Sequence, residues 1–161
     1  MSNVHTEEEQ TITEQKEHTD TPPISDSMSV PYFGYQLIRD VLLPDLLGKD
    51  TEQILYWAGK NIARKHPVET PEEIVMFFIR TGWGALSLLK QDKNEMELEI
   101  SGPMVQKRLK ENKGCSFHLE AGFIAQQIQQ QNQCVAEAYL TLKERAHKVM
   151  ITVKWDKKDK L

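Results

Sequence analysis

The stretch "EMELEI" at residues 95–100 decides the fold class. Three glutamates alternate there with Met96, Leu98 and Ile100, so that an apolar side chain stands at every second position. Because successive side chains of a β-strand point to opposite faces, this pattern is typical of a strand with one face in the core and one in water. The segments before it follow a period near 3.6, so the switch predicts helices followed by a sheet, an α+β domain.

Three further segments supply partners for this strand. "WGALSLLK" at residues 83–90, followed by the turn-prone "QDKN" at 91–94, predicts the first arm of a hairpin. Residues 134–143 and 148–155 alternate in the same way, and "ERAH" links them into a second hairpin. We therefore expect one antiparallel sheet of about four strands, with helices over its apolar face.

Three helices are expected before the sheet. Residues 31–48 repeat apolar residues at intervals of three, four and seven, and Pro44 with Gly48 closes the segment. Residues 50–66 open with a pattern like a capping box, and residues 70–82 have a threonine at the cap, a proline at the first helical position and a glycine at the end.

A fourth helix is expected between the two hairpins. Residues 101–114 contain two glycines and a proline, and we expect an irregular connection that can hold a short element. "CSFHLEAGFIAQQIQ" at residues 115–129 then places Phe117, Ala121 and Ile124 on one stripe, which predicts an amphipathic helix. The predicted order of elements is αααββαββ.

The composition divides the 161 residues into a tail and one domain. Residues 1–29 hold seven acidic residues and one lysine, a charge of −6, so the remaining residues carry +2 of the total of −4. Because this segment has hardly any large apolar side chains, we predict a disordered acidic tail, which either solubilises the protein or docks on a basic partner. We expect a single domain over residues 30–156 and a solvated end at 157–161.

Several classes of protein are disfavoured by the sequence. The acidic N-terminus lacks the apolar core of a secretory signal, and the longest apolar run, "IVMFFI" at residues 74–79, is too short to span a bilayer. We therefore predict a cytoplasmic protein with no membrane span. The basic residues are interspersed with acidic ones instead of forming a basic face, which argues against nucleic-acid binding.

Cys115 and His118 are the candidates for chemistry, as an activated thiol, as part of a metal site or as ordinary packing. A thiol at a helix start has a lowered pKa. The sequence, however, shows no motif for the base, the orienting residue and the oxyanion site that a catalytic thiol needs. Cys134 follows the fourth helix, and about 14 helical residues span about 20 Å, so it cannot share an ion with the other two unless the connection doubles back or a second subunit contributes. Packing is the favoured interpretation; we predict no catalytic residue, metal or cofactor, and Cys115 with His118 stay the metal candidates.

Three segments of the sequence resemble those of a known family. They are "GYQLIRDVLLPDLLGKDTEQILYWAGKNIAR" at 34–64, "GWGALSLLK" at 82–90 and "FHLEAGFIAQQIQ" at 117–129. Over residues 31–155 the chain resembles the YslB-like bacterial proteins, an uncharacterised family of Firmicutes. More remotely, it is similar to the 4-vinyl-reductase-type small-molecule-binding domain and to the TRAPP-component fold. The resemblance implies an α+β domain that forms a homodimer and has an apolar cavity between helices and sheet.

Two functions of different classes follow. The first is a non-enzymatic domain that binds a small apolar ligand between helices and sheet, where small side chains either pack tightly or leave a slot. The second is a dimeric protein-interaction scaffold without a small ligand. The residues expected to line the cavity are Leu37, Val41, Leu55, Phe78, Trp83, Phe117, Ala121, Ile124 and Ala138.

Overall fold

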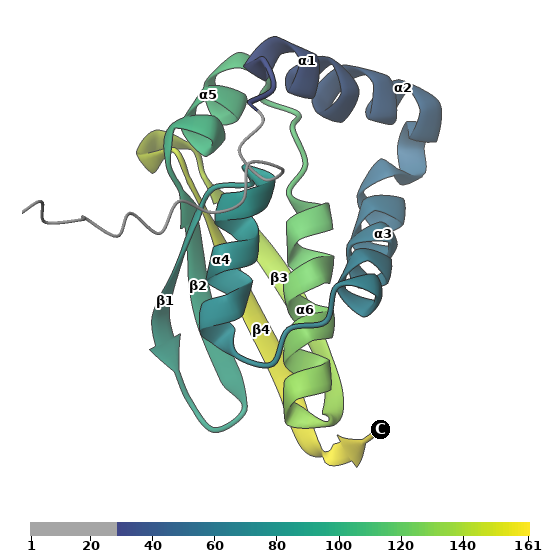
Figure 1. Ribbon diagram of the computed structural model, residues 1–161, viewed down its shortest axis with the longest axis vertical. Coiled ribbons are helices and arrows are strands. Elements are labelled where there is room, and N and C mark those ends of the chain that lie inside the picture. The colour runs from purple at the N-terminus through teal and green to yellow at the C-terminus, as the bar shows by residue number, and fades with distance from the viewer. Residues whose placement is uncertain (1–28) are drawn as a thin grey trace, which may run out of the picture.

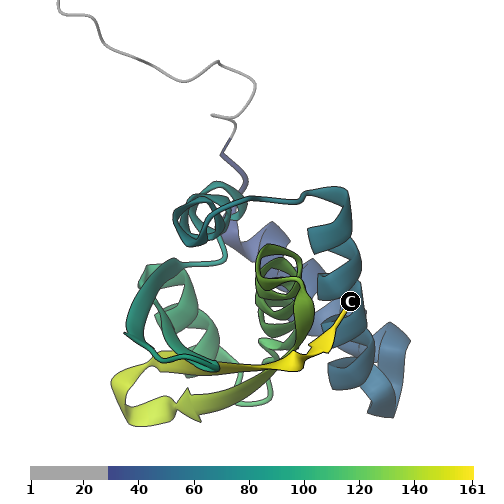
Figure 2. The ribbon, with the colours of Figure 1, turned by 90° about the horizontal axis from the view of Figure 1, so that it is seen from below.

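All the long helices lie on one side of a single sheet. Figure 1 shows this arrangement in the computed structural model, which describes residues 29–161. The acidic tail expected at residues 1–29 therefore falls, except for its last residue, outside the described residues. Figure 2 shows the same layers along the strands, with helix α6 between the sheet and helix α3.

The sheet has four antiparallel strands in the order β1-β2-β4-β3. Their bounds are Ala85–Gln91 (β1), Glu95–Ser101 (β2), Cys134–Lys143 (β3) and Lys148–Lys160 (β4). The two hairpins are β1–β2 and β3–β4, and the pairing of β2 with β4 joins them in the middle of the sheet. The predicted antiparallel sheet of two hairpins is confirmed.

The alternation in β2 separates a buried face from a wet one. Met96, Leu98 and Ile100 are buried, whereas the three glutamates of the strand are partly exposed. On the wet face Glu99 forms an ion pair of 2.9 Å with Lys148 of β4. Charged cross-strand neighbours of this kind keep one side of an antiparallel sheet compatible with water.

The N-terminal helices confirm most of the predicted boundaries. The first helical rod consists of α1 (Tyr32–Gln36), a π-helical segment η2 (Leu37–Leu42) and α2 (Leu43–Leu47), followed by the short turn η3 (Gly48–Asp50). Helices α3 (Thr51–Lys65) and α4 (Pro71–Thr81) come next. In α4 the Thr70 hydroxyl accepts a hydrogen bond from the Glu73 N–H, and Gly82 ends the helix with a positive φ of 71°.

The connection expected over residues 101–114 contains a regular helix, α5 (Pro103–Glu111). This helix starts after Gly102, which has a φ of 109°, and Pro103 occupies the first helical position. The two residues therefore begin a regular helix and do not make the connection irregular. Val105 and Leu109 are buried and hold α5 against the end of the sheet.

Helix α6 (His118–Asn132) is not amphipathic as expected, because it is buried on every side from Leu119 to Ile128. It lies between the sheet and α3, so no face of its central turns meets water. Its buried polar side chains are hydrogen-bonded: Gln127 donates to the His66 carbonyl at 2.7 Å and accepts from the Val68 N–H at 3.1 Å.

Helices α3 and α6 touch backbone to backbone. A Cβ atom added at Gly59 would overlap the carbonyl oxygen of Leu119, and one added at Gly122 would overlap that of Tyr56. The two glycines therefore permit an approach that no other residue allows. At this crossing the small residues pack tightly and leave no slot.

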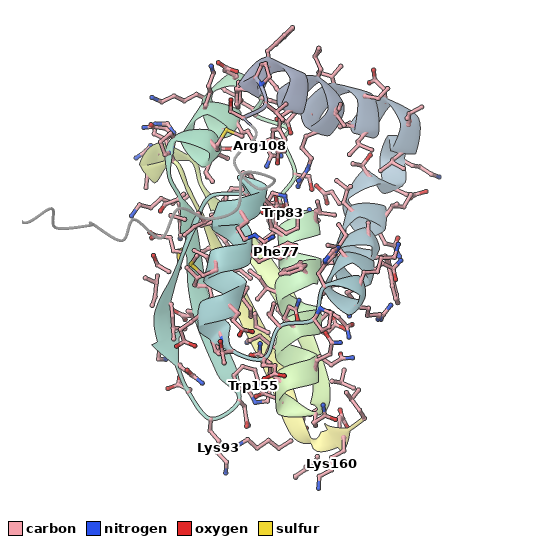
Figure 3. All side chains as sticks on the ribbon, viewed as in Figure 1. Phe77, Trp83, Lys93, Arg108, Trp155 and Lys160 are labelled. Atoms are coloured by element: carbon pink, nitrogen blue, oxygen red, sulfur yellow. The ribbon has the colours of Figure 1, made fainter. Side chains whose placement is uncertain are left out.

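Aromatic side chains fill the space between α4, α6 and the sheet. Phe77 stacks on Phe123 with ring centroids 4.3 Å apart, and Trp83 meets the edges of Phe78 and Phe123. Figure 3 shows Phe77 and Trp83 together in this layer. Within residues 29–161 no helix is both long and apolar enough to cross a bilayer.

Replacing Gly122 by alanine is expected to destabilise the fold by about 1 to 3 kcal/mol or more, because the new methyl group must push two helix backbones apart. The matched control is Gly34→Ala in α1, where a Cβ would meet nothing within 4 Å and where alanine favours the helix by about 0.5 to 1 kcal/mol. Urea unfolding at one protein concentration measures both; equal stability of the two variants would contradict the close helix contact.

Candidate functional site

The first helical rod turns two charged residues inward and six large apolar residues outward, while Leu43 and Leu47 pack against the core. Arg39 and Asp40 are only 5% and 8% exposed, whereas Phe33, Ile38 and Leu46 are 66%, 58% and 71% exposed. A helix on the surface of a globular protein normally shows the reverse pattern. This inversion is the feature from which the candidate site is built.

The π-helical segment η2 brings two consecutive residues to the inner side. In an α-helix successive side chains point about 100° apart, so neighbours seldom share a face. Hydrogen bonds from i to i+5 place more residues in each turn and bring successive side chains closer in direction. Arg39 and Asp40 lie in the middle of η2, between the exposed pairs Leu37–Ile38 and Val41–Leu42.

Four buried charges meet beneath the rod and form what we call the ion cluster: Arg39, Asp40, Arg108 of α5 and Glu120 of α6. The Nη2 group of Arg39 donates to both carboxylate oxygens of Glu120, at 2.6 and 2.8 Å. Arg108 donates from Nη2 and Nε to the two oxygens of Asp40, at 2.7 and 3.1 Å. Both arginines also donate to the Ser116 carbonyl, at 2.9 Å from Arg108 and 3.4 Å from Arg39.

The cluster is electrically balanced, with two positive and two negative groups. Burial on its own lowers the pKa of Arg108, but its hydrogen bonds to Asp40 and the charge of Glu120 raise that pKa above its ordinary value. The guanidinium also lies 4.3 Å from the ring centroid of Phe117. The cluster thus fastens the rod to α5 and α6, and it fixes which side of the rod faces inward.

The residues predicted to line a cavity separate into two groups. Leu55, Phe78, Trp83, Phe117, Ala121 and Ile124 are buried in the core. Ala138 of β3 is half-buried at the edge of this core. Leu37 and Val41 instead lie on the exposed side of the rod and not in the seam between helices and sheet. The structure therefore does not bring the nine residues together around one space, and their contact with a ligand stays a prediction.

Cys115 and His118 lie near the ion cluster. Cys115 is buried and unbonded, and burial raises the pKa of its thiol, which opposes the activation that a helix start would give. His118 Nδ1 lies 2.9 Å from the Ser116 hydroxyl, and its Nε2 lies 3.7 Å from a carboxylate oxygen of Glu52. No group of three or more histidine, cysteine or acidic residues suited to a metal ion occurs within residues 29–161.

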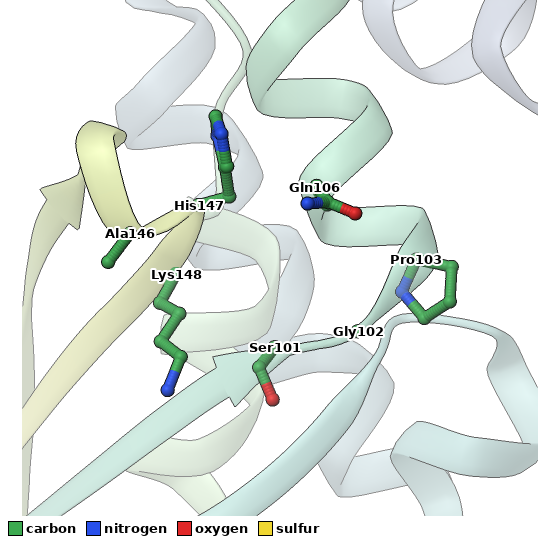
Figure 4. A pocket seen from close by; sticks show the side chains of 7 residues that line it. All are labelled: Ser101, Gly102, Pro103, Gln106, Ala146, His147 and Lys148. Atoms are coloured by element: carbon green, nitrogen blue, oxygen red, sulfur yellow. The ribbon is translucent and has the colours of Figure 1, made fainter.

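Two cavities border the helices. One of about 250 Å³ lies against the ion cluster and is lined by side chains of the rod, of the start of α3 and of the loop at 114–116. The other, of about 280 Å³, lies where α5 begins and is shown in Figure 4. Lys148 lines this second cavity, and its ammonium group pairs with Glu99.

A family described as "Protein of unknown function (DUF2507)" matches residues 32–154, nearly the whole described chain. The chain belongs to this family. Its DUF2507 domain therefore includes the rod, strands β1 to β3, the first seven residues of β4 and every member of the ion cluster.

This DUF2507 protein is similar to one bacterial relative and to one solved structure. It is 51% identical over 127 residues to the "Uncharacterized protein YslB" of Bacillus subtilis (strain 168), a match covering 79% of this chain and 86% of the relative. Its fold resembles that of a vinyl-4-reductase family protein from Methanocaldococcus jannaschii, with a TM-score of 0.61 and 18% identity, over 82% of this chain and 85% of the other. The second match shows a shared fold, as the sequence had predicted.

Sequence reasoning did not find the ion cluster of the DUF2507 protein, although two signals were present. "LIRDVL" at residues 37–42 sets a charged pair between two apolar pairs, and "FHLEAGFIA" at residues 117–125 sets Glu120 within an apolar run. A charge within a segment that must be buried requires a partner of opposite sign. The pairing itself joins residues about 70 to 80 positions apart, which a single sequence cannot show.

Removing one member of the cluster is expected to be costly. Glu120→Ala leaves two buried guanidinium groups with one carboxylate between them, and we expect a loss of about 3 to 5 kcal/mol in the free energy of unfolding. The double variant Arg39→Met/Glu120→Leu removes one charge of each sign and should recover most of that loss. Chemical denaturation followed by circular dichroism measures both variants.

The control is Lys154→Ala, which breaks the exposed ion pair with Glu95 on the wet face of the sheet. Exposed pairs contribute about 0 to 1 kcal/mol, so this variant should unfold almost like the parent chain. A Glu120→Ala variant as stable as Lys154→Ala would show that the cluster does not hold the rod.

The Cys115 thiol is expected to react slowly with a disulfide reagent at neutral pH, because it is buried and its pKa is raised. Since the folded-state pKa is above the unfolded one, the thiol stabilises the fold below its ordinary pKa, and this contribution is lost as the pH rises through the folded pKa. Thiol release with and without denaturant tests the expectation. Immediate release from the folded protein, absent in Cys115→Ser, would contradict it.

Proposed function

We propose that this protein is a homodimeric interaction module that pairs through the outer face of its first helical rod. The observation that carries the proposal is the inverted rod, in which Arg39 and Asp40 are held inward while six large apolar side chains face water. We call this surface the apolar face. It consists of Phe33, Leu37, Ile38, Val41, Leu42 and Leu46, each more than 40% exposed.

The apolar face is large enough to matter. The rod has about 16 residues and is about 24 Å long. Its six large side chains leave on the order of 500 Å² of apolar surface exposed, close to the largest patches that monomers show. Two copies pairing face to face would bury about 1,000 Å², which is the lower bound for a specific interface. Ile54 and Trp57 of α3, both exposed, would extend it.

A second copy of the chain is the partner that matches this face. Asp45 is the only charged residue exposed on the rod, so the face offers almost nothing to a charged partner. It needs a surface as apolar as itself, and the chain already carries one. A two-fold axis through the rod sets the same residues against each other, as in most homodimers. Leu37 and Val41, predicted to line a cavity, would then be buried by the partner copy.

The binding of a small apolar ligand between helices and sheet is the alternative. It rests on the fold similarity and on the small residue Ala138, which packs at the edge of the core. Native mass spectrometry of freshly purified protein separates the two functions. A mass of two chains with nothing added supports the dimer; one chain with an extra lipid-sized mass supports the ligand and argues against the dimer.

Leu42→Lys is expected to convert the dimer into a monomer, because it places a charge in the centre of the apolar face. Leu42 is exposed in the single chain, so the fold should be unaffected. Sedimentation velocity over a wide range of concentrations measures the change, and circular dichroism verifies the fold.

Leu89→Lys is the matched control, since Leu89 is equally exposed but lies on β1, away from the rod. It should leave the association unchanged. A parent chain that sediments as a monomer at every concentration, or equal weakening by both lysine variants, would contradict the proposal.

A further inference from the structure

We infer that the acidic N-terminal segment of this chain docks on a basic surface at the end of the molecule where α5 meets the β3–β4 connection. We call this surface the basic end and define it by Lys110, Lys143, Arg145 and Lys148. Lys148 also lines the cavity of Figure 4. The apolar face of the rod is a different surface, so the inference does not depend on the proposed dimer.

The β3–β4 connection concentrates positive charge. Lys143 and Lys148 stand directly opposite each other at the pair that closes the hairpin, where like charges repel. Arg145 lies between them and is exposed. Among residues 29–161, Lys148 has a carboxylate partner, Glu99 at 2.9 Å, whereas Lys143 and Arg145 have none. An anion placed here would relieve the repulsion between the cations.

Helix α5 adds the fourth cation. Lys110 lies one turn beyond Gln106, so the two side chains share a face of the helix. Because Gln106 lines the cavity together with residues 146–148, this face is directed toward the β3–β4 connection. Lys107 and Glu111 pair with each other at 3.8 Å. Lys110 is exposed and has no ion-pair partner within residues 29–161.

The cavity at the basic end can accept a carboxylate group. It has a volume of about 280 Å³, and none of the seven residues that line it is acidic. The Ser101 hydroxyl and the Gln106 amide line it, and neither side chain makes a hydrogen bond to residues 29–161. Figure 4 shows both side chains, with Lys148, around the cavity. Hydroxyl, amide and ammonium donors are the groups that hydrogen-bond to a carboxylate.

The N-terminal segment matches the basic end in charge and in position. Residues 1–29 carry a charge of −6. The basic end has four cations against the carboxylates of Glu99 and Glu144, a net charge of +2. The segment joins the fold just before Tyr32, whose ring centroid lies 4.3 Å from the Nζ atom of Lys107 on α5. It therefore enters the fold beside one of the two elements that form the basic end.

The segment is also long enough to reach the basic end. Its acidic residue nearest to the fold is Asp26, and Asp20 and Glu17 lie about one turn of chain further away. A random-coil chain of ten residues spans about 17 Å, and the nine residues of α5 span about 14 Å. Attachment to the same chain gives an effective concentration of about 1 mM. Exposed ion pairs too weak to hold a free peptide therefore suffice to hold this segment.

A second group of basic residues supplies the control surface. Lys157, Lys158 and Lys160 lie at the C-terminal end of β4, which Figure 1 shows at the opposite end of the molecule from α5. Asp156 and Asp159 are interspersed with them. This end is exposed like the basic end but lies far from the point where the N-terminal segment joins the fold.

Nuclear magnetic resonance of the ¹⁵N-labelled full chain tests the inference. It compares the parent chain with a variant whose N-terminal acids are replaced by amides: Glu7→Gln, Glu8→Gln, Glu9→Gln, Glu14→Gln, Glu17→Gln, Asp20→Asn and Asp26→Asn. The amide signals of residues 106–110 and 143–148 should differ between the two chains, and those of residues 156–160 should not. About 0.5 M salt, with a Debye length of about 4 Å, should move the parent signals toward those of the variant.

Identical signals at residues 143–148 in the two chains, or equal differences at both ends of the molecule, would overturn the inference. The comparison is repeated in the Leu42→Lys background, which removes the proposed dimer. The differences should persist there, because the segment docks on its own chain. Their loss in that background would show docking on a second copy and would also overturn the inference.

Two charge-reversed variants complete the test. In Lys110→Glu/Arg145→Glu, neutralising the N-terminal acids should shift the signals of residues 106–110 and 143–148 at least about fivefold less than in the parent chain, because opposite charges no longer attract. Lys157→Glu/Lys158→Glu is the matched control and should respond like the parent. All four side chains are exposed, so neither change should affect folding. Equal responses of the two variants would overturn the inference.

Discussion

The structure depends on the burial of four charges at the junction of three helices. Arg39 and Asp40 can be buried only because each has a partner of opposite charge. The Nη2 atom of Arg39 lies 2.6 Å from a carboxylate oxygen of Glu120, and the Nη2 atom of Arg108 lies 2.7 Å from one of Asp40. Charges in a protein interior tolerate few arrangements, since each needs a partner and nearly every hydrogen bond satisfied. The cluster therefore specifies how the rod lies on α5 and α6 more strictly than apolar contacts would.

The orientation of the rod has consequences on both of its sides. On the inner side, the cluster leaves the Nε–H group of Arg39 buried without a hydrogen-bond partner among residues 29–161. On the outer side, the apolar residues that would ordinarily build a core face water. The core itself does without them, because the aromatic side chains of α4 and α6 fill the layer above the sheet and the glycines of α3 and α6 close the remaining gap. The rod is thus available for binding.

The fold was predictable from local patterns, whereas the site was not. Alternation in β2, the cap at Thr70 and the stop at Gly82 each act within a few residues, and each appears where the sequence predicts it. The burial of α6 and the direction of the rod depend on which elements meet in space. Apolar spacing at Leu37 and Val41 indicates a helix but cannot say whether the stripe faces the core or a partner. That choice is made by charges about 80 residues away.

The most direct test of the account is a filtered nuclear Overhauser experiment on a mixture of ¹³C-labelled and unlabelled chains, which records contacts between copies only. If the rod pairs two copies, contacts between chains will come from the methyl groups of Leu37, Ile38, Val41 and Leu42, and none will come from Leu88 or Leu89 of β1. If those methyl groups contact only their own chain, above all the core beneath α6, then the rod does not face outward and the account is wrong.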